Sequence, residues 1–423
     1  MHMKTSATAS HAAEEGLSSA KNRRVSSIAF IVVAGTWLAT VFHYVLGIYK
    51  SKPYPLNTYL FRANDNFMDF YNNLNYASHF MSGKKDVIAY SPFAQTVMGA
   101  LSAFPVRLAL VLAMTAFMVT VGMLVWRFLV DDLRQSLALR LAVAFILTAM
   151  TYPVLFTLDR GNEEAFVFIA LAWFAYLYFV EHSRWAGVLL GMAIAYKMYP
   201  GVLVVLFVAD RRWKDLLITG VTTLGLTAAG TFLLGALSGY GPVLVLRYWF
   251  NTLFVGHVGY SGTLEAAQHG HSIWGAVVTL MGRLQGGEPV GLSTRAYVIV
   301  ALLSFVALSA YVVFAERSDW KRVTLLVIAM LILPLESHDY TLIHLLIPIA
   351  LFVNSVRGRL DMVYAVLFGL LLIPLDYYIV INEVSSAAFI YPAALLAIVA
   401  MIVGQRFMGA GARGSRGKDR VTA

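Results

Sequence analysis

The chain has 423 residues, of which 59% are hydrophobic and 13% are charged. Soluble domains carry about 25% charged residues, so this composition excludes an ordinary soluble protein and indicates an integral membrane protein. The chain contains no cysteine, which excludes disulfides and metal sites built from thiolates.

Long apolar runs follow one another from Ser26 almost to the C-terminus. Runs of about 20 residues are typical of membrane-spanning helices rather than of a barrel. We therefore predict an all-α, polytopic membrane protein with about ten full spans and one broken half-helix hairpin. The expected full spans are 26–48, 106–130, 136–158, 165–180, 215–237, 294–315, 323–335, 340–356, 361–381 and 391–404.

Polar tails flank this apolar region at both ends. Residues 1–25 are expected to form a disordered cytoplasmic tail, and residues 406–423 a basic cytoplasmic tail. Residues 26–405 then make a single transmembrane domain. Its polar interruptions are a first outer loop over 49–105, which we expect to be catalytic, and a second outer loop over 238–293.

The expected hairpin, residues 185–209, contains a lysine and a proline near its middle, Lys197 and Pro200. As one span it would place the basic cluster Arg211 to Lys214 outside, against the positive-inside rule. Two half-length helices would instead return the chain to the cytoplasm and bring every basic cluster, with both termini, to the inner side. Topology thus explains the net charge of +9, and we expect no nucleic-acid partner.

The stretch 64–92 of the first outer loop is the most polar part of the chain outside the two tails. A dense polar loop held against an apolar scaffold is a place where chemistry is expected. Asp69 is the candidate catalytic base in this stretch. Asp65 is the alternative base, and Asp69 could also be a solvated loop acid.

Further ionisable residues fall on the outer side of this topology. Arg160 and Lys197 suit a phosphate, as a bidentate fork and a point charge respectively. His338 is the third candidate for the phosphate of a donor. The candidates for other substrate contacts are Asp65, Tyr71, Asn162, Glu163, Tyr199, His271, Asp339 and His344. Plainer alternatives stay open, such as an Arg160–Glu163 ion pair or a Lys197 side chain that extends to the interface.

Metal-binding motifs are missing from the sequence. His338 and His344 lack the i, i+4 spacing of a helical metal pair, and neither an HExxH motif nor an EF-hand loop occurs. We therefore expect no obligatory metal and no cofactor.

Several motifs in order along the chain give it a family likeness. The chain resembles the GT-C membrane glycosyltransferases, most closely glycosyltransferase family 87, of the polyprenol-phosphate-mannose-dependent mannosyltransferase type. The motifs that carry the resemblance are Asp69-Phe70-Tyr71, Tyr90-Ser91-Pro92, Phe104-Pro105, the segment from Ala186-Gly187 to Lys197-Met198-Tyr199-Pro200, His269-Gly270-His271, and Ser337-His338-Asp339-Tyr340. At the corner 160–163 the chain departs from the family, since the glutamine is absent and the asparagine comes one place earlier.

The resemblance implies a GT-C-like fold and a glycosyltransferase that moves a hexosyl residue, mannosyl in that family type, from a polyprenyl-phosphate sugar donor. The acceptor would be a glycolipid or an oligosaccharide on the outer face of a bacterial inner membrane. The resemblance implies inversion with Asp69 as general base, while Lys197 and Arg160 neutralise the departing phosphate.

Two alternative functions fit parts of the sequence. A flippase or transporter of lipid-linked sugars would also contain broken helices and buried charges, and it would predict inverted repeats, of which the sequence gives no sign. A polymerase or ligase that uses a lipid-diphosphate donor would favour outer loops dense in arginine, and these loops are poor in arginine.

Overall fold

The computed structural model describes residues 3–418, apart from 85–89, 134, 254–259, 268–269, 288, 290, 357 and 378–384. Within these residues the chain forms helices and turns, and the β-type contact found there is an isolated antiparallel bridge between Gly270 and His338. The all-α prediction is therefore confirmed for the described part of the chain.

The helices follow one another with short connections. Up to the hairpin they are α1 (Met3–Ile48), η1 (Ala63–Asp65), α2 (Met68–Met81), α3 (Pro92–Leu101), α4 (Val106–Leu124), η2 (Val125–Val130), α5 (Leu137–Ala149), α6 (Tyr152–Arg160), α7 (Glu164–Phe179), α8 (Trp185–Tyr196), η3 (Tyr199–Leu203) and α9 (Val204–Ala209). After it come α10 (Trp213–Ser238), α11 (Gly241–Asn251), α13 (Leu264–Ala267), α14 (Ile273–Gln285), α15 (Thr294–Phe314), α16 (Asp319–Ile332), η5 (Asp339–Leu345), α17 (Leu346–Val353), α18 (Asp361–Leu370) and α19 (Ala387–Lys418).

The described residues contain five helical segments that are long and apolar enough to cross a membrane. They are Ser18–Ile48, Val106–Val130, Trp213–Ser238, Thr294–Phe314 and Ala387–Arg406, and the pair α5 and α6, bent by 51°, makes a sixth if it counts as one span. The prediction of about ten full spans is not confirmed, because the other apolar segments form shorter helices of 10–17 residues or less. Helix α16 shows why an apolar segment need not be a span. Nearly all its residues are buried inside the protein, so they are apolar because they form part of the core.

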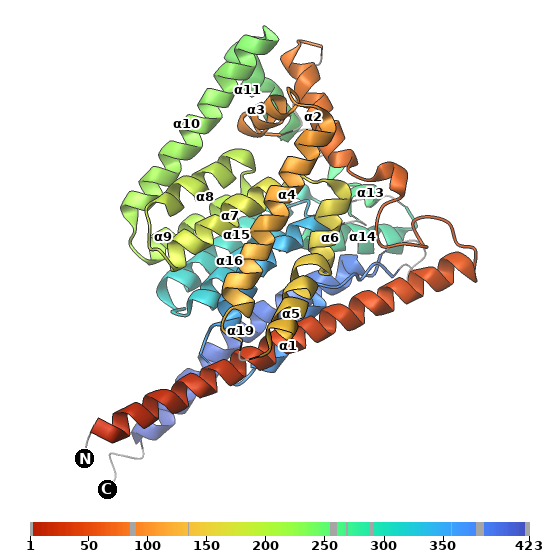
Figure 1. Ribbon diagram of the computed structural model, residues 1–423. Coiled ribbons are helices and arrows are strands. Elements are labelled where there is room, and N and C mark those ends of the chain that lie inside the picture. The colour runs from red at the N-terminus through yellow and green to blue at the C-terminus, as the bar shows by residue number, and fades with distance from the viewer. Residues whose placement is uncertain are drawn as a thin grey trace.

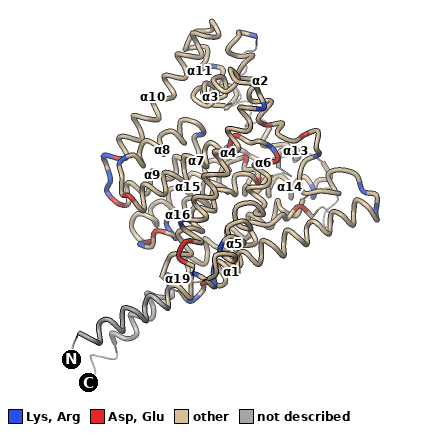
Figure 2. The backbone as a smooth tube through the Cα atoms, viewed as in Figure 1, with Lys and Arg blue, Asp and Glu red and all other residues tan. Residues whose placement is uncertain are grey.

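Two of the long helices expose apolar side chains along most of their length. Leu224 of α10 is 73% exposed and Leu303 of α15 is 64% exposed. Figure 2 shows that α10 carries charged residues where it begins and none along its middle. Such surfaces are expected where a helix contacts lipid, so these helices indicate a membrane-embedded protein.

The tails differ from their predicted disorder. Helix α1 begins at Met3 and α19 continues to Lys418, so most of both predicted tails is helical. Neither tail contains a proline, and a packed span can propagate a helix into its flank. Arg24 also belongs to the fold, since it is 1% exposed and donates hydrogen bonds to the backbone oxygens of Phe352 (2.9 Å) and Ser355 (2.7 Å).

The segment after α7 forms a hairpin. Helix α8 stops where Lys197 takes an extended conformation, and η3 and α9 then lead the chain back. Arg212 marks the point of return, because its guanidinium donates to the backbone oxygens of Tyr178 (3.5 Å) and Ser183 (3.2 Å), which precede the hairpin. Residues on either side of the hairpin therefore lie together, and Lys197 sits at its tip.

Helix α8 packs closely against α10. A Cβ added at Gly187 would lie 2.7 Å from the backbone oxygen of Asp215, and a Cβ added at Gly191 would lie 2.7 Å from the Thr222 Cβ. Glycines four residues apart let two helix backbones approach in membranes. At the other end of α8, the Ser91 hydroxyl lies 2.5 Å from the Ala195 oxygen. These contacts fix the direction of α8 and the place of the lysine that follows it.

Figure 1 shows how these elements are arranged. The two termini lie together at the lower left, and α1 runs obliquely beneath the central helices. Helices α2, α3 and α11 lie with the end of α10 at the top of the view, remote from the termini. The groups described next lie among α2, the corner between α6 and α7, the hairpin tip and η5.

Candidate active site

Asp69 lies in the first turn of α2, beside the corner at which α6 ends. Helix α6 ends because Gly161 takes a left-handed conformation (φ +59°), which a glycine adopts without steric cost. An added Cβ there would also lie 3.2 Å from the Cα of Phe67. The Phe67 N–H donates to the Asp159 backbone oxygen at 2.7 Å, and this bond holds the start of α2 against the corner.

Two side chains of this corner hold the carboxylate of Asp69. The Arg160 Nε donates to Asp69 Oδ2 at 3.1 Å and its Nη2 contacts Oδ1, while the Asn162 Nδ2 donates to Oδ2 at 2.6 Å. The guanidinium also lies over the ring of Phe61, 3.9 Å from its centroid. Asp69, Arg160 and Asn162 are thus brought together as the sequence suggested, but Arg160 has an acidic partner here. Its role toward a phosphate stays a prediction.

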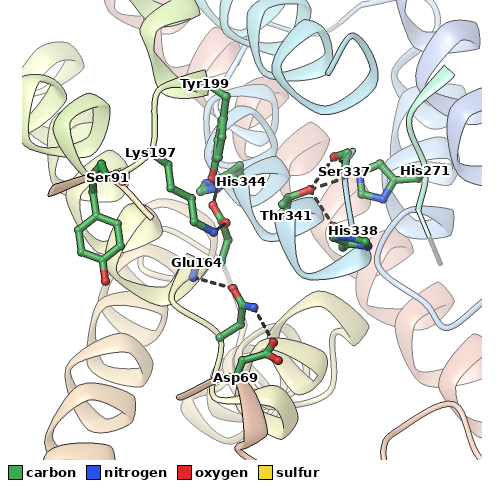
Figure 3. Close-up of polar contacts among 12 residues, drawn as sticks. Asp69, Ser91, Glu164, Lys197, Tyr199, His271, Ser337, His338, Thr341 and His344 are labelled. Carbon is green, nitrogen blue, oxygen red and sulfur yellow. Dashed lines mark hydrogen bonds and ion pairs between the residues drawn. The ribbon is translucent and has the colours of Figure 1, made fainter. Parts of the chain in front are cut away.

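Glu164, at the start of α7, joins the hairpin tip to η5. Its Oε2 accepts from the Lys197 Nζ at 2.7 Å, and its Oε1 lies 2.7 Å from His344 Nε2 (Figure 3). The Tyr199 hydroxyl lies 3.0 Å from the same imidazole nitrogen. Asn162 connects this group to Asp69, since its Oδ1 accepts from the Glu164 backbone N–H at 2.9 Å. Sequence reasoning missed Glu164, although it did find Lys197, Tyr199 and His344.

The neighbouring Glu163, which the sequence did single out, takes a different position. It is fully buried near the Tyr196 hydroxyl, and neither of its carboxylate oxygens makes a hydrogen bond of good distance and angle in the described part of the chain. Burial raises the pKa of Glu163 to about 8, although Lys197 opposes the shift. Glu163 does not line the cavity described next, so its predicted contact with a substrate stays a prediction.

A cavity of about 500 Å³ opens beside Lys197. The lysine Nζ lies 5.3 Å from the ring centroid of Tyr90 and 5.8 Å from that of Tyr340, which both line the cavity. Its other walls are formed by Ser91, Glu164, Tyr196, Met198, Tyr199, Trp249, Thr252, Leu253, Met330, Pro334, Leu335, Glu336, Ser337, His338 and Thr341. An ammonium among aromatic and aliphatic side chains can bind a ligand that combines an anion with an apolar part.

The second outer loop meets the corner before η5 at this cavity. The backbone N–H of His271 donates to the Ser337 backbone oxygen at 2.8 Å. In the His271 ring, Nδ1 lies 3.2 Å from Asp339 Oδ1 and Nε2 lies 3.0 Å from Ser337 Oγ. His271 is fully buried, and burial lowers its pKa to about 3, so the ring is neutral. Asp339 and His271 are therefore brought together behind the wall that carries His338 and Ser337.

Comparison with models of protein families matches residues 88–336 to glycosyltransferase family 87. The chain belongs to glycosyltransferase family 87. It is therefore a glycosyltransferase, an enzyme that moves a sugar from a donor to an acceptor. Searches of curated proteins and of solved structures returned no match. The family match includes Glu164 and Lys197, whereas Asp69 precedes it and His338 follows it.

The other predicted residues of this family 87 enzyme lie apart from these contacts. Asp65 is in η1, four residues before Asp69, and Tyr71 follows on α2 with its ring 6.5 Å from that of Phe70. His269 lies outside the described residues, as do residues 254–259 of the second outer loop. Among the residues that the structure describes, no three His, Asp or Glu side chains are grouped to hold a metal ion. Independence from metal stays a prediction.

Proposed function

We propose that the chain transfers a hexosyl residue, mannosyl by its family resemblance, from a polyprenyl-phosphate donor to a glycolipid or glycan acceptor. The transfer inverts the anomeric carbon, with Asp69 as general base. One observation carries the proposal: Asn162 bonds both Asp69 and the backbone of Glu164, whose carboxylate binds Lys197. One corner of the fold thus holds a base and a cation suited to a phosphate.

The surroundings of Lys197 support a lipid-phosphate donor. An ammonium has three N–H donors, and Glu164 accepts from one of them, which leaves donors for phosphate oxygens. The cavity beside it is lined by Tyr90, Tyr340 and aliphatic side chains, as an apolar chain next to the phosphate requires. His338 lines the same cavity and is a further candidate to contact the phosphate.

The geometry of Asp69 supports its role as base. A carboxylate offers about four lone-pair sites, and Arg160 and Asn162 occupy two at Oδ2 and one at Oδ1. Oδ1 therefore keeps a site for the proton of an acceptor hydroxyl. In the proposed step the acceptor oxygen bonds to the anomeric carbon while the bond from that carbon to the phosphate oxygen breaks. The proton passes to Asp69, and the electron pair leaves with the phosphate beside Lys197.

We place this reaction at the outer face of a bacterial inner membrane, with both termini in the cytoplasm. The distribution of Lys and Arg along the sequence supports this orientation. So does the arrangement in Figure 1, where the termini lie together and α11, whose Trp249 lines the cavity, lies at the opposite end.

The test is a transfer assay with the purified chain in nanodiscs. The donor is radiolabelled polyprenyl-phosphate mannose, the acceptors are a panel of glycolipids and oligosaccharides, and EDTA is present throughout. We expect label to move to an acceptor, and Asp69→Asn to lower turnover by at least about 10², because the amide cannot take the proton. Donor binding should persist in this variant.

Asp65→Asn is the matched control, since Asp65 lies in the same loop and the structure places it in η1, before α2. Retained turnover in Asp69→Asn would show that Asp69 is not the base. Loss of turnover in Asp65→Asn alone would assign the role of base to Asp65. If no sugar is transferred while intact lipid-linked sugar crosses between leaflets, the transporter alternative replaces the proposal.

A further inference from the structure

A chain of hydrogen-bonding groups runs from the wall of the cavity into the protein. Ser337 lines the cavity, and its Oγ lies 3.0 Å from His271 Nε2. The Nδ1 of that ring lies 3.2 Å from Asp339 Oδ1, and the other oxygen of Asp339 lies 3.2 Å from the Tyr152 hydroxyl. Tyr152 donates in turn to Asp376 Oδ2 at 2.7 Å. The mechanism proposed above uses none of these contacts.

The chain determines where the proton of His271 lies. A neutral imidazole carries one proton, and the hydrogen bond of one nitrogen decides which nitrogen has it. Nδ1 faces the carboxyl group of Asp339, an acceptor, so we assign the proton to Nδ1. Nε2 is then an acceptor and needs a donor from the side of the cavity. The candidates are the hydroxyls of Ser337 (3.0 Å) and Thr341 (3.3 Å).

Thr341 already uses its proton elsewhere. Its hydroxyl donates to the backbone oxygen of His338 at 2.8 Å, and a hydroxyl has a single proton to give. The proton of Ser337 is therefore directed inward, toward His271 Nε2 and the Thr341 Oγ1, which lies 3.1 Å away. Because the one proton of this hydroxyl is directed inward, any hydrogen bond that the Ser337 Oγ makes with a ligand of the cavity must be one that it accepts. Such an oxygen binds a hydroxyl and repels a phosphate oxygen.

We propose that Ser337 determines sugar specificity by accepting a hydrogen bond from one ring hydroxyl of the bound donor. His271 and Tyr152 are positioning residues that keep the proton of Ser337 directed away from the cavity. The inference rests on the proposed function, since it takes the ligand of this cavity to be a hexosyl phosphate lipid. It also orients that ligand, with the phosphate toward Lys197 and the sugar toward Ser337.

A purely structural role makes a different prediction. The contacts of His271 also fasten the second outer loop to the corner before η5, and loosening that corner would weaken the binding of every donor alike. A group that reads one hydroxyl instead affects donors selectively, because only the donor that carries the hydroxyl loses a bond. The ratio of two affinities therefore separates the roles.

The experiment measures dissociation constants of the full chain in nanodiscs. The ligands are polyprenyl-phosphate mannose, analogues that each lack one sugar hydroxyl, and polyprenyl phosphate without sugar. We expect the wild type to bind one analogue at least about tenfold more weakly than the parent donor, the loss of one hydrogen bond to a built site. In Ser337→Ala that ratio should fall to about twofold or less, while binding of the sugar-free lipid stays unchanged.

Two further variants complete the test. Tyr152→Phe keeps the ring but removes the hydroxyl that links Asp339 to Asp376, and it should lower the same ratio in part. Ser309→Ala is the matched control, because Ser309 lies on α15, does not line the cavity, and its hydroxyl has no hydrogen-bond partner in the described residues. It should leave every ratio unchanged.

The outcomes separate the two proposals. If the wild type discriminates but Ser337→Ala keeps the full ratio for every analogue, the inference about Ser337 is wrong and the proposed function stands. A wild type that binds all analogues equally also overturns it. Selective binding without sugar transfer in the parallel assay would support Ser337 as a reader of the sugar and count against the proposed reaction. A chain that binds none of these lipids overturns both.

Discussion

Glu164 is the residue on which the charges beside the cavity depend. It is fully buried and contacts both Lys197 and His344 at 2.7 Å. A buried ammonium without a partner is costly, because protein surroundings do not replace the water that it loses. Glu164 therefore allows Lys197 to remain charged at the tip of the hairpin, where the proposed reaction needs a cation.

Removing Glu164 should destabilise the protein, and a second substitution should restore part of the loss. Glu164→Ala leaves Lys197 unpaired, which costs about 3 kcal/mol by comparison with other broken buried pairs. In Glu164→Ala with Lys197→Met no buried charge of this pair remains, so the thermal midpoint in detergent should rise again while transfer stays lost. Glu181→Ala, at an exposed contact with Tyr176, should change neither quantity. A double variant no more stable than Glu164→Ala would contradict this account of the pair.

At the scale of single residues, the sequence singled out candidate groups but not the side chains that they contact. Asp69, Asn162 and Lys197 were identified because polar residues stand out between apolar runs. Glu164 was not, because Glu163 and Glu164 are adjacent and lie about 100° apart around a helix, so the phase of α7 decides which one faces Lys197. A single sequence does not fix that phase. Nor did it show that Arg160 would bind Asp69.

The hairpin formed by α8, η3 and α9 is the element that carries Lys197 to the cavity. Its direction depends on close packing with α10, where the Thr219 hydroxyl lies 3.0 Å from the Gly187 backbone oxygen and 2.9 Å from that of Asp215, and Thr223 donates to the Gly191 backbone oxygen at 3.1 Å. Van der Waals contact and such interhelical hydrogen bonds are what hold helices together in lipid. Displacing α8 from α10 would therefore displace Lys197.

Gly191→Ala tests this packing. The added methyl would lie 2.7 Å from the Thr222 Cβ and 2.8 Å from the Thr219 oxygen, so α8 must shift. We expect a loss of about 1–3 kcal/mol in stability, as for other overpacked sites, together with weaker donor binding. Gly220→Ala on α10 is the control, since nothing lies within 4 Å of its added Cβ, and alanine favours a helix. Equal behaviour of the two variants in thermal unfolding would show that α8 is not held in this way.

The pattern of charged residues predicted the hairpin, whereas hydropathy overestimated the number of full spans. The basic residues after 209 required the chain to return, and the contacts of Arg212 with Tyr178 and Ser183 confirm that it does. The expected span 361–381 shows the opposite case, because α18 ends at Leu370. Hydropathy measures whether a segment avoids water, and a buried helix avoids it as well as a spanning one.

Across the whole molecule, α1 ties the N-terminus to the C-terminal half. Arg24 lies against the last turn of α17 and also pairs with Asp361 at the start of α18, at 2.5 Å. A cation is favoured at a helix C-terminus, where the last backbone oxygens lack partners within the helix. The end of the segment that the sequence suggested to be a tail is thus part of the core.

Arg24→Met should therefore lower the stability of the entire protein. It leaves Asp361 without its cationic partner and removes the guanidinium donors from the end of α17, so we expect a loss of about 3 kcal/mol. Arg23→Met is the control, because Arg23 is the preceding basic residue and is exposed. The measurement is the thermal midpoint of unfolding in detergent. Identical midpoints for the two variants would return residues before 26 to the status of a tail.

The contacts of Arg212 have a consequence for how such enzymes can diverge. Because the residues before and after the hairpin lie together, a change in the length of both its arms would alter the depth of Lys197 without moving the point at which α10 begins. The hairpin is in that respect a replaceable insert. Shorter or longer arms would match the cation to lipid phosphates at other depths in other bilayers, with the remaining scaffold inherited intact.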